Sequence, residues 1–118
     1  MECYLDNSAT TKPCKAAVDA EISALTELYG NPSSLHQKGV DAYMLLEKSR
    51  GTIAASLKAS PDEIYFTPCG TVSNNTAIFG AVGAKKRLGK KIVTTALEHP
   101  SVEKCMERLE ESGFEVER

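Results

Sequence analysis

Short β-favouring runs alternate with apolar helical stripes in the carboxyl-terminal half of the chain, and this alternation most constrains the fold. We predict strands at 64–67, 91–95 and 114–117, separated by helices from about Thr71 to Leu88 and from Pro100 until Gly113. This order is typical of α/β domains with parallel strands and right-handed crossovers. Sheets of this class average about five or six strands. The sequence therefore predicts an α/β domain with an incomplete sheet, cut off after its third strand.

Two further helices are predicted in the amino-terminal half. Thr11-Lys12-Pro13 is a helix-start signal, because threonine can cap and proline fits the first turn, and Gly30 ends this helix. A second helix opens at Ser33-Ser34, and residues 60–63 have the pattern of a capping box that opens a single turn. The positions of the predicted helices expected to face inward are Val18, Ile22, Leu25, Tyr29, Ala42, Leu45 or Leu46, Ser49, Ile53, Leu57, Ala77, Ile78, Ala81, Val82, Val102, Cys105, Met106 and Leu109.

Composition excludes several classes of function. With 118 residues, the chain is expected to form one compact domain. Its net charge of −2 gives no basic surplus for nucleic-acid binding. No apolar run approaches the ~20 residues that cross a bilayer, and no signal peptide is visible. The cysteines at positions 3, 14, 69 and 105 form no metal or disulfide pattern, so we interpret them as reduced thiols of a cytoplasmic protein.

The loop Pro68-Cys69-Gly70-Thr71 is the strongest candidate for a binding site. It lies between a predicted strand and a predicted helix, where α/β sheets bind ligands. The helix start offers unpaired N–H groups and a partial positive charge, Gly70 allows close approach of an anion, and the hydroxyls of Thr71 and Ser73 can add donors. The loop fits one phosphate, although it is not a Walker A sequence. The alternative is an ordinary strand-to-helix turn with Thr71 as N-cap.

Four other residues or groups could carry chemistry. His99 follows the second predicted strand and is either a site residue or a polar turn residue. Cys69 is the thiol expected to be most reactive, because a helix amino terminus favours the thiolate, but the favoured interpretation is a small residue tolerated in a tight turn. His36 could cap a helix or face a site. The basic cluster of Lys85-Lys86-Arg87 with Lys90-Lys91 lies at a helix end, where its simplest role is to complement the helix dipole.

Four motifs occur together in an order that resembles a known family. They are Tyr4-Leu5-Asp6-Asn7-Ser8-Ala9-Thr10-Thr11, Gly30-Asn31-Pro32-Ser33-Ser34-Leu35-His36, Gly70-Thr71 with Ser73-Asn74-Asn75, and Thr94-Thr95 with Glu98-His99-Pro100. Together they resemble the amino-terminal part of a cysteine desulfurase of the iron–sulfur-cluster assembly and nitrogen-fixation type. These enzymes belong to the class V aminotransferases, which depend on pyridoxal 5'-phosphate.

The resemblance implies a partial aspartate-aminotransferase-like large domain of PLP fold type I. Residues 1–15 would lie on the small-domain side, and residues 16–118 would begin the cofactor-binding domain. Gly70 and Thr71 match positions that bind the cofactor phosphate, and His99 matches the histidine that stacks on the pyridine ring. The full enzyme would be a homodimer that takes sulfur from L-cysteine, leaves alanine, and passes the sulfur to an iron–sulfur scaffold or another acceptor protein.

The same resemblance places much of the machinery beyond residue 118. The family's Schiff-base lysine, pyridine-binding aspartate, persulfide cysteine and substrate-binding arginine have no match here, so the chain alone is expected to be inactive. Pro68-Cys69 replaces the usual Ser-Gly, and Val72 replaces the usual glutamate. Two alternatives stay open. One is a related enzyme, such as a selenocysteine lyase or an aminotransferase, and the other is an inactive fragment that binds a phosphate-bearing ligand or a partner.

Overall fold

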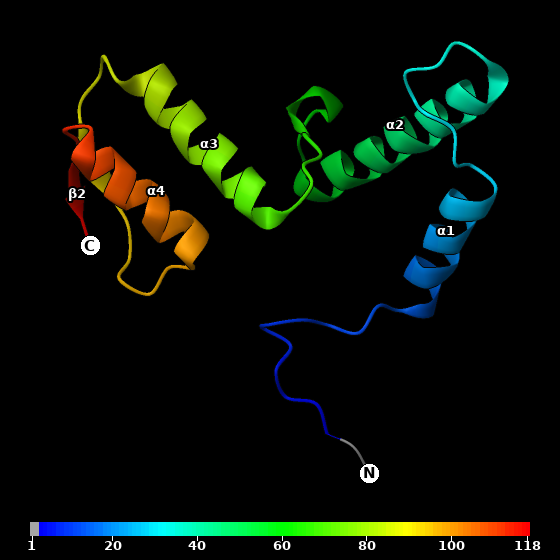
Figure 1. Ribbon diagram of the computed structural model, residues 1–118, viewed down its shortest axis with the longest axis horizontal. Coiled ribbons are helices and arrows are strands. Elements are labelled where there is room, and N and C mark those ends of the chain that lie inside the picture. Colours follow the sequence, from blue (N-terminus) through cyan, green and yellow to red (C-terminus); the bar gives the residue numbers. More distant parts are fainter. Residues whose placement is uncertain (1–2) are drawn as a thin grey trace. The chain divides into compact units, whose positions relative to one another are not determined.

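The computed structural model describes residues 3–118 (Figure 1). The chain divides into two compact units, the first ending at Ile64 and the second comprising Tyr65–Arg118. The length predicts one domain instead. The buried apolar cluster, built on Cys105, Met106 and Leu109, lies in the second unit. Within residues 3–118, no helix has the length and apolar character needed to cross a membrane.

The first unit contains helix α1 (Lys15–Thr26), helix α2 (Gln37–Leu57) and the single 3-10 turn η1 (Pro61–Glu63). The helix predicted from Thr11 begins later, with Cys14 as its N-cap. The hydroxyl of Thr11 donates to the carbonyl of Asn7 instead of capping a helix. The predicted apolar stripe of α1 is present, but its side chains are exposed.

A tight loop joins α1 to α2 and replaces the predicted helix start at Ser33-Ser34. Ser33 N–H donates to the Asn31 side chain and Ser34 N–H donates to the Asn31 carbonyl, so both residues belong to a turn. Helix α2 starts at Gln37, where the Nδ1 of His36 accepts from the Gly39 amide as an N-cap. His36 therefore has a local structural role.

Helix α2 buries little of its predicted face. Ala42 and Ala54 are buried, whereas Ile53 and Leu57, both predicted to be buried, are exposed. The described elements of this unit cover little of α2, whose main packing partner among them is η1. The predicted capping box of η1 is confirmed, with the Ser60 amide donating to Glu63 Oε2 at 2.8 Å.

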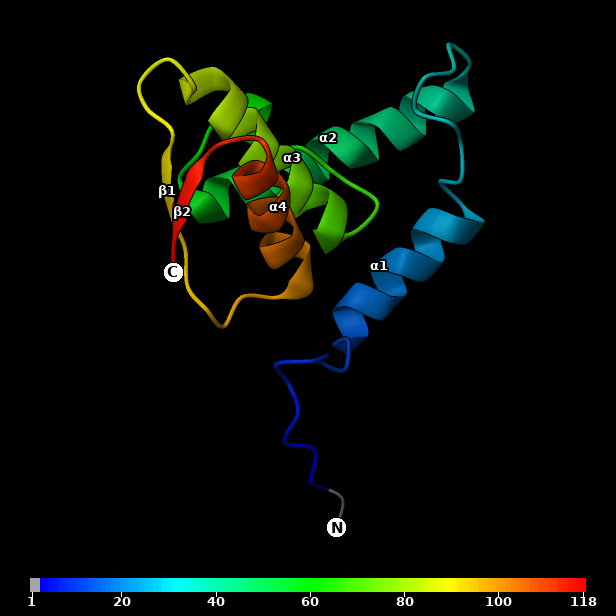
Figure 2. The same ribbon diagram turned by 60° about the vertical axis from the view of Figure 1, so that its left-hand side comes forward.

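The second unit alternates helices and strands as predicted. It contains α3 (Gly70–Lys85), β1 (Lys91–Val93), α4 (Pro100–Glu111) and β2 (Glu115–Glu117). The strands pair in parallel, with Ile92 opposite Val116, and Figure 2 shows them side by side. The parallel pair and its helical crossover confirm the α/β class.

The strand predicted at 64–67 does not form, and this part of the prediction was wrong. The segment has no strand assignment, and the sheet of the described chain has two strands, β1 and β2. A β-strand needs a partner for its N–H and C=O groups. The β-favouring residues 64–67 remain outside the sheet, with Tyr65 and Phe66 exposed.

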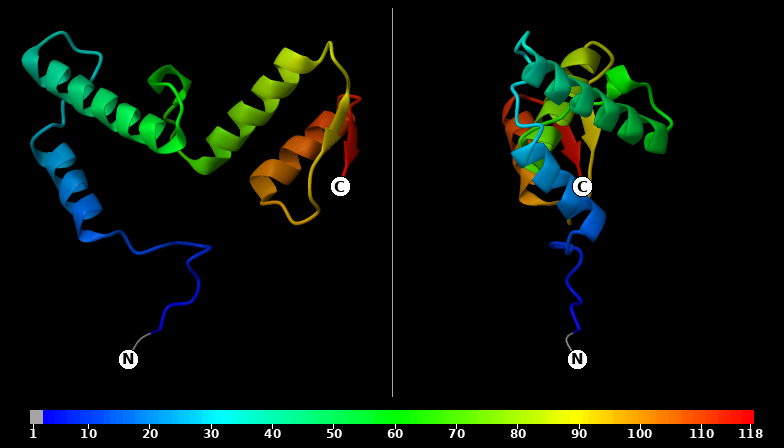
Figure 3. Two further views of the ribbon diagram at one scale, coloured as in Figure 1. Left: turned by 180° about the vertical axis from the view of Figure 1, so that it is seen from behind. Right: turned by 90° about the vertical axis from the view of Figure 1, so that its right-hand side faces the viewer.

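The core of the second unit is built on one face of α4. Cys105, Met106 and Leu109 are buried there, as predicted. The partly buried side chains that pack against them come from α3, from both strands and from adjacent residues, namely Ile78, Val82, Ile92, Val102, Phe114 and Val116. The left view of Figure 3 shows both strands beside α4.

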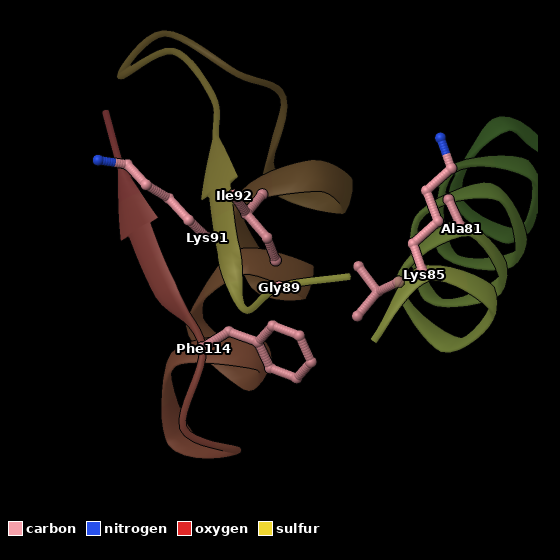
Figure 4. Close-up of a pocket in the computed structure, with 7 residues that line it drawn as sticks. Ala81, Lys85, Gly89, Lys91, Ile92 and Phe114 are labelled. Atoms are coloured by element: carbon pink, nitrogen blue, oxygen red, sulfur yellow. The ribbon is translucent and has the colours of Figure 1, made fainter. Parts of the chain in front are cut away.

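Helix α3 contributes a narrower face to this core than predicted. Ile78 and Val82 pack into the core, but Ala77 and Ala81 are exposed. Ala81 instead borders an open apolar cavity of about 190 Å³ between α3 and the strands. Figure 4 shows Ile92 and the Phe114 ring in this cavity, while the amino group of Lys91 points away from it.

Gly39 is predicted to be required by the α1–α2 loop, because a Cβ there would lie 2.2 Å from the carbonyl oxygen of Ser34. Gly39→Ala should therefore lower the thermal unfolding midpoint of the protein. Gly51 is a matched control in the same helix, since a Cβ there meets nothing within 4 Å. Gly51→Ala should stabilise by up to about 1 kcal/mol through helix propensity. Circular dichroism melts would contradict this account if both variants shifted the midpoint in the same direction.

Candidate functional site

The amino terminus of α3 leaves backbone donors without a helical acceptor. Cys69 is the N-cap in extended conformation, and its side chain makes no capping hydrogen bond. The first helical bond runs from the Ser73 amide to the Cys69 carbonyl at 3.1 Å. The backbone amides of Gly70, Thr71 and Val72 come before that bond and have no acceptor within the helix, and we call them the orphan amides. The alternative that made Thr71 the N-cap is wrong, because Thr71 lies inside the first turn.

Hydroxyl groups hold the loop before α3 in shape. The hydroxyl of Thr67 lies 3.1 Å from the Cys69 carbonyl oxygen, to which it donates, and it also pairs with the hydroxyl of Ser73. The Ser73 hydroxyl oxygen also lies 3.4 Å from the Cys69 carbonyl oxygen, so its single proton can point either to that carbonyl or to Thr67. The Ser73 hydroxyl, considered from sequence as a ligand donor, is thus engaged within the loop, and Thr71 is the hydroxyl left near the orphan amides.

Gly70 leaves open space at the helix start. A Cβ built on Gly70 would meet no heavy atom within 4 Å. Packing within the described chain therefore does not require glycine at this position, and a larger residue would occupy space that a ligand can use. Cys69, next to it, is exposed.

His99 has the same position at the start of α4 that Cys69 has at the start of α3. It is the N-cap of that helix, and its Nδ1 accepts a hydrogen bond from the Ser101 amide at 3.1 Å. The same nitrogen lies 2.8 Å from the hydroxyl oxygen of Ser101. The residue is exposed and does not belong to the core cluster.

Two asparagines of α3 connect it to α4. Asn74 donates from Nδ2 to the Ser101 hydroxyl oxygen at 2.8 Å, and Asn75 Oδ1 accepts from the Cys105 thiol. Ser101 is only 8% exposed, and burial raises the pKa of the Cys105 thiol. Cys105 is thus a neutral core residue, as predicted. The roles of Asn74 and Ser101 were missed, because no local pattern reveals a contact across 27 positions.

Gly70, Thr71 and His99 line one open cavity of about 370 Å³. Asn74 and Ser101 complete the lining. The sequence predicts that the first three residues share a pocket, and the structure brings them together. Their role as cofactor ligands stays a prediction.

The cavity suits an anion although none of its lining side chains carries a fixed charge. The amino termini of α3 and α4 both meet it, and each helix start carries about half a positive charge. Orphan amides and the Thr71 hydroxyl supply hydrogen-bond donors. No cluster of His, Cys, Asp and Glu in the described part of the chain could hold a metal ion. The arrangement can therefore bind a phosphate-sized anion beside an imidazole.

Comparison with known proteins gives a consistent result. Residues 3–118 match the family model of class-V aminotransferases. The chain is 50% identical over 115 residues to a "NifS/IcsS protein homolog" of Lactobacillus delbrueckii subsp. bulgaricus, an alignment that covers 98% of this chain and 30% of that protein. It is 42% identical over 118 residues to cysteine desulfurase NifS of Azotobacter vinelandii, covering 99% and 29% of the two chains.

Solved structures agree with these relatives. A NifS-like protein superimposes with a TM-score of 0.89 at 37% identity, covering 99% of this chain and 32% of the other. SspA in complex with cysteine gives a TM-score of 0.80 at 30% identity, covering 92% and 31%. The chain thus spans about 30% of the length of the curated relatives it matches.

Proposed function

Because the chain belongs to the class-V aminotransferase family, we propose that its cavity at the starts of α3 and α4 is part of the pyridoxal 5'-phosphate site of a cysteine desulfurase. The observation that carries this proposal is the shared lining by Gly70, Thr71 and His99. These residues fit the cofactor, because orphan amides and a hydroxyl face an open space that has no competing carboxylate in its lining.

Each lining residue has a distinct task in this proposal. The amides of Gly70 and Thr71 and the Thr71 hydroxyl hold the phosphate, and the partial charge of the α3 terminus stabilises it. His99 lies against the pyridine ring, as in the family it resembles. When bound, pyridoxal phosphate supplies an electron sink for the amino-acid substrate. The lysine that holds it in the family would lie beyond residue 118.

The departures from the family pattern leave this cavity intact. Pro68, Cys69 and Val72 are absent from its described lining. Pro68 precedes the N-cap and removes one backbone donor outside the orphan set. Val72 replaces a carboxylate near the cofactor but leaves the donors at Gly70 and Thr71 unchanged. These substitutions are therefore compatible with a phosphate at this position.

The activity of the whole protein follows from the same family. We propose that it converts L-cysteine to alanine while an enzyme thiol gains the sulfur atom as a persulfide, which is then passed to an iron–sulfur scaffold or another acceptor. The names of the relatives and the neighbour in complex with cysteine support this substrate. We also propose a cytoplasmic homodimer, in keeping with four unpaired cysteines among the described residues.

Replacing Thr71 by valine in the full-length protein should weaken cofactor binding. The change preserves size but removes one donor to a charged phosphate, a loss of about 1.5–3 kcal/mol, or roughly tenfold or more in affinity. Thr76→Val on the exposed surface of α3 is the control, because Thr76 does not line the cavity. The dissociation constants can be measured by fluorescence titration of the apoprotein. Equal constants for both variants would show that the phosphate binds elsewhere.

Residues 1–118 alone should release no sulfide or alanine from L-cysteine, even with added pyridoxal phosphate. The resemblance assigns none of the lysines or cysteines in this segment to the Schiff-base or persulfide position. Sulfide and alanine are measured against a no-protein control, with the full-length protein as positive control. Release by the segment clearly above the no-protein control would refute this assignment.

A further inference from the structure

A chain of hydrogen bonds runs from α3 through α4 to the imidazole of His99. Asn74 Nδ2 lies 2.8 Å from Ser101 Oγ, which lies 2.8 Å from His99 Nδ1. The Ser101 amide also reaches Nδ1, at 3.1 Å. All three residues line the same cavity.

The direction of this chain follows from what each group can do. An amide nitrogen only donates, so Ser101 Oγ accepts from Asn74. The Ser101 backbone amide also only donates, so His99 Nδ1 must accept. The proton of the Ser101 hydroxyl is then free to point at Nδ1. In a neutral imidazole that accepts at Nδ1, the proton is on Nε2.

We propose that Asn74 and Ser101 are positioning residues whose side chains add to the Ser101 backbone amide in keeping His99 in the tautomer with its proton on Nε2. The group that accepts the hydrogen bond from Nε2 follows from the proposed function, in which His99 belongs to the cofactor site. Ser101 is nearly buried, and a buried hydroxyl is costly to leave unpaired, so its two bonds are strongly favoured. Among residues 3–118, no hydrogen bond to Nε2 is found, so this N–H is available to the cavity.

The tautomer matters because the cavity suits an anion. A proton on Nε2 presents a donor to the cavity, whereas a proton on Nδ1 would leave a lone pair there, opposing negative charge. Helix capping alone needs only Nδ1 and the Ser101 amide. The additional bond from Asn74 on a different helix is what sets the direction of the hydroxyl, and it makes the orientation of His99 depend on the packing of α3 against α4.

The test is nitrogen-15 NMR of the protein labelled at histidine, without cofactor and at a pH where His99 is neutral. His99 is assigned by the loss of its signals in His99→Gln. The unmodified protein should show an acceptor nitrogen at Nδ1 and a protonated nitrogen at Nε2. Ser101→Ala removes one donor to Nδ1 and should raise the Nδ1-protonated fraction about fivefold relative to the Nε2 form.

Asn74→Asp provides a second, near-isosteric variant. Its carboxylate would accept the Ser101 hydroxyl proton, turning the oxygen lone pairs toward Nδ1 and favouring protonation there. Ser101→Thr keeps the hydroxyl and should preserve the original tautomer. Thr76→Asp introduces the same charge at an exposed position of α3 and should change nothing.

Two results would overturn the inference. One is a proton on Nδ1 in the unmodified protein, which can be read even if a variant fails to fold. The other is an unchanged tautomer in both Ser101→Ala and Asn74→Asp. Because no cofactor is present, the outcome is independent of the Thr71→Val titration. If the His99 ring is protonated on Nε2 but Thr71→Val binds pyridoxal phosphate as tightly as the Thr76→Val control, only the cofactor assignment is refuted.

Discussion

The packing of α3 against α4 is the constraint on which the rest of the second unit depends. Buried Cys105, Met106 and Leu109 of α4 meet Ile78 and Val82 of α3, and the Asn74–Ser101 hydrogen bond fixes the ends of the two helices. Apolar burial supplies most of the favourable free energy and is not directional. The polar contact is directional, so it determines that two helix amino termini meet at one cavity. A site without a fixed charge can therefore attract an anion.

The parallel strands place this helix pair correctly. Parallel pairing of β1 with β2 requires a crossover, and α4 is that crossover. Its amino terminus must then lie near the carboxyl end of β1, the end at which α/β sheets bind ligands. His99 is the N-cap at that point, so its position follows from topology. In the first unit, by contrast, the connection between α1 and α2 requires two glycines. A Cβ would lie 2.0 Å from the Lys38 carbonyl oxygen at Gly30 and 2.2 Å from the Ser34 carbonyl oxygen at Gly39.

Local patterns predicted the helices and the two paired strands of the second unit and the capping box at Ser60, and the family resemblance implied a common site for Gly70, Thr71 and His99. They failed where an outcome depends on a partner. Residues 64–67 favour a strand but are not part of the described sheet, and Ile53 and Leu57 have a helical apolar pattern yet are 38% and 66% exposed. The link from Asn74 to Ser101 depends on how two helices pack, which spacing does not encode. The domain boundary expected after residue 15 stays a prediction.

The proposed function requires that the orphan amides at the start of α3 hold the cofactor phosphate. Backbone amide chemical shifts of the labelled apoprotein, recorded with pyridoxal phosphate and separately with pyridoxal, test it most directly. The account predicts that the amides of Gly70, Thr71 and Val72 shift strongly with pyridoxal phosphate and much less with pyridoxal, because only the former carries the anion. Unchanged amides at these positions in the presence of bound pyridoxal phosphate would contradict the account.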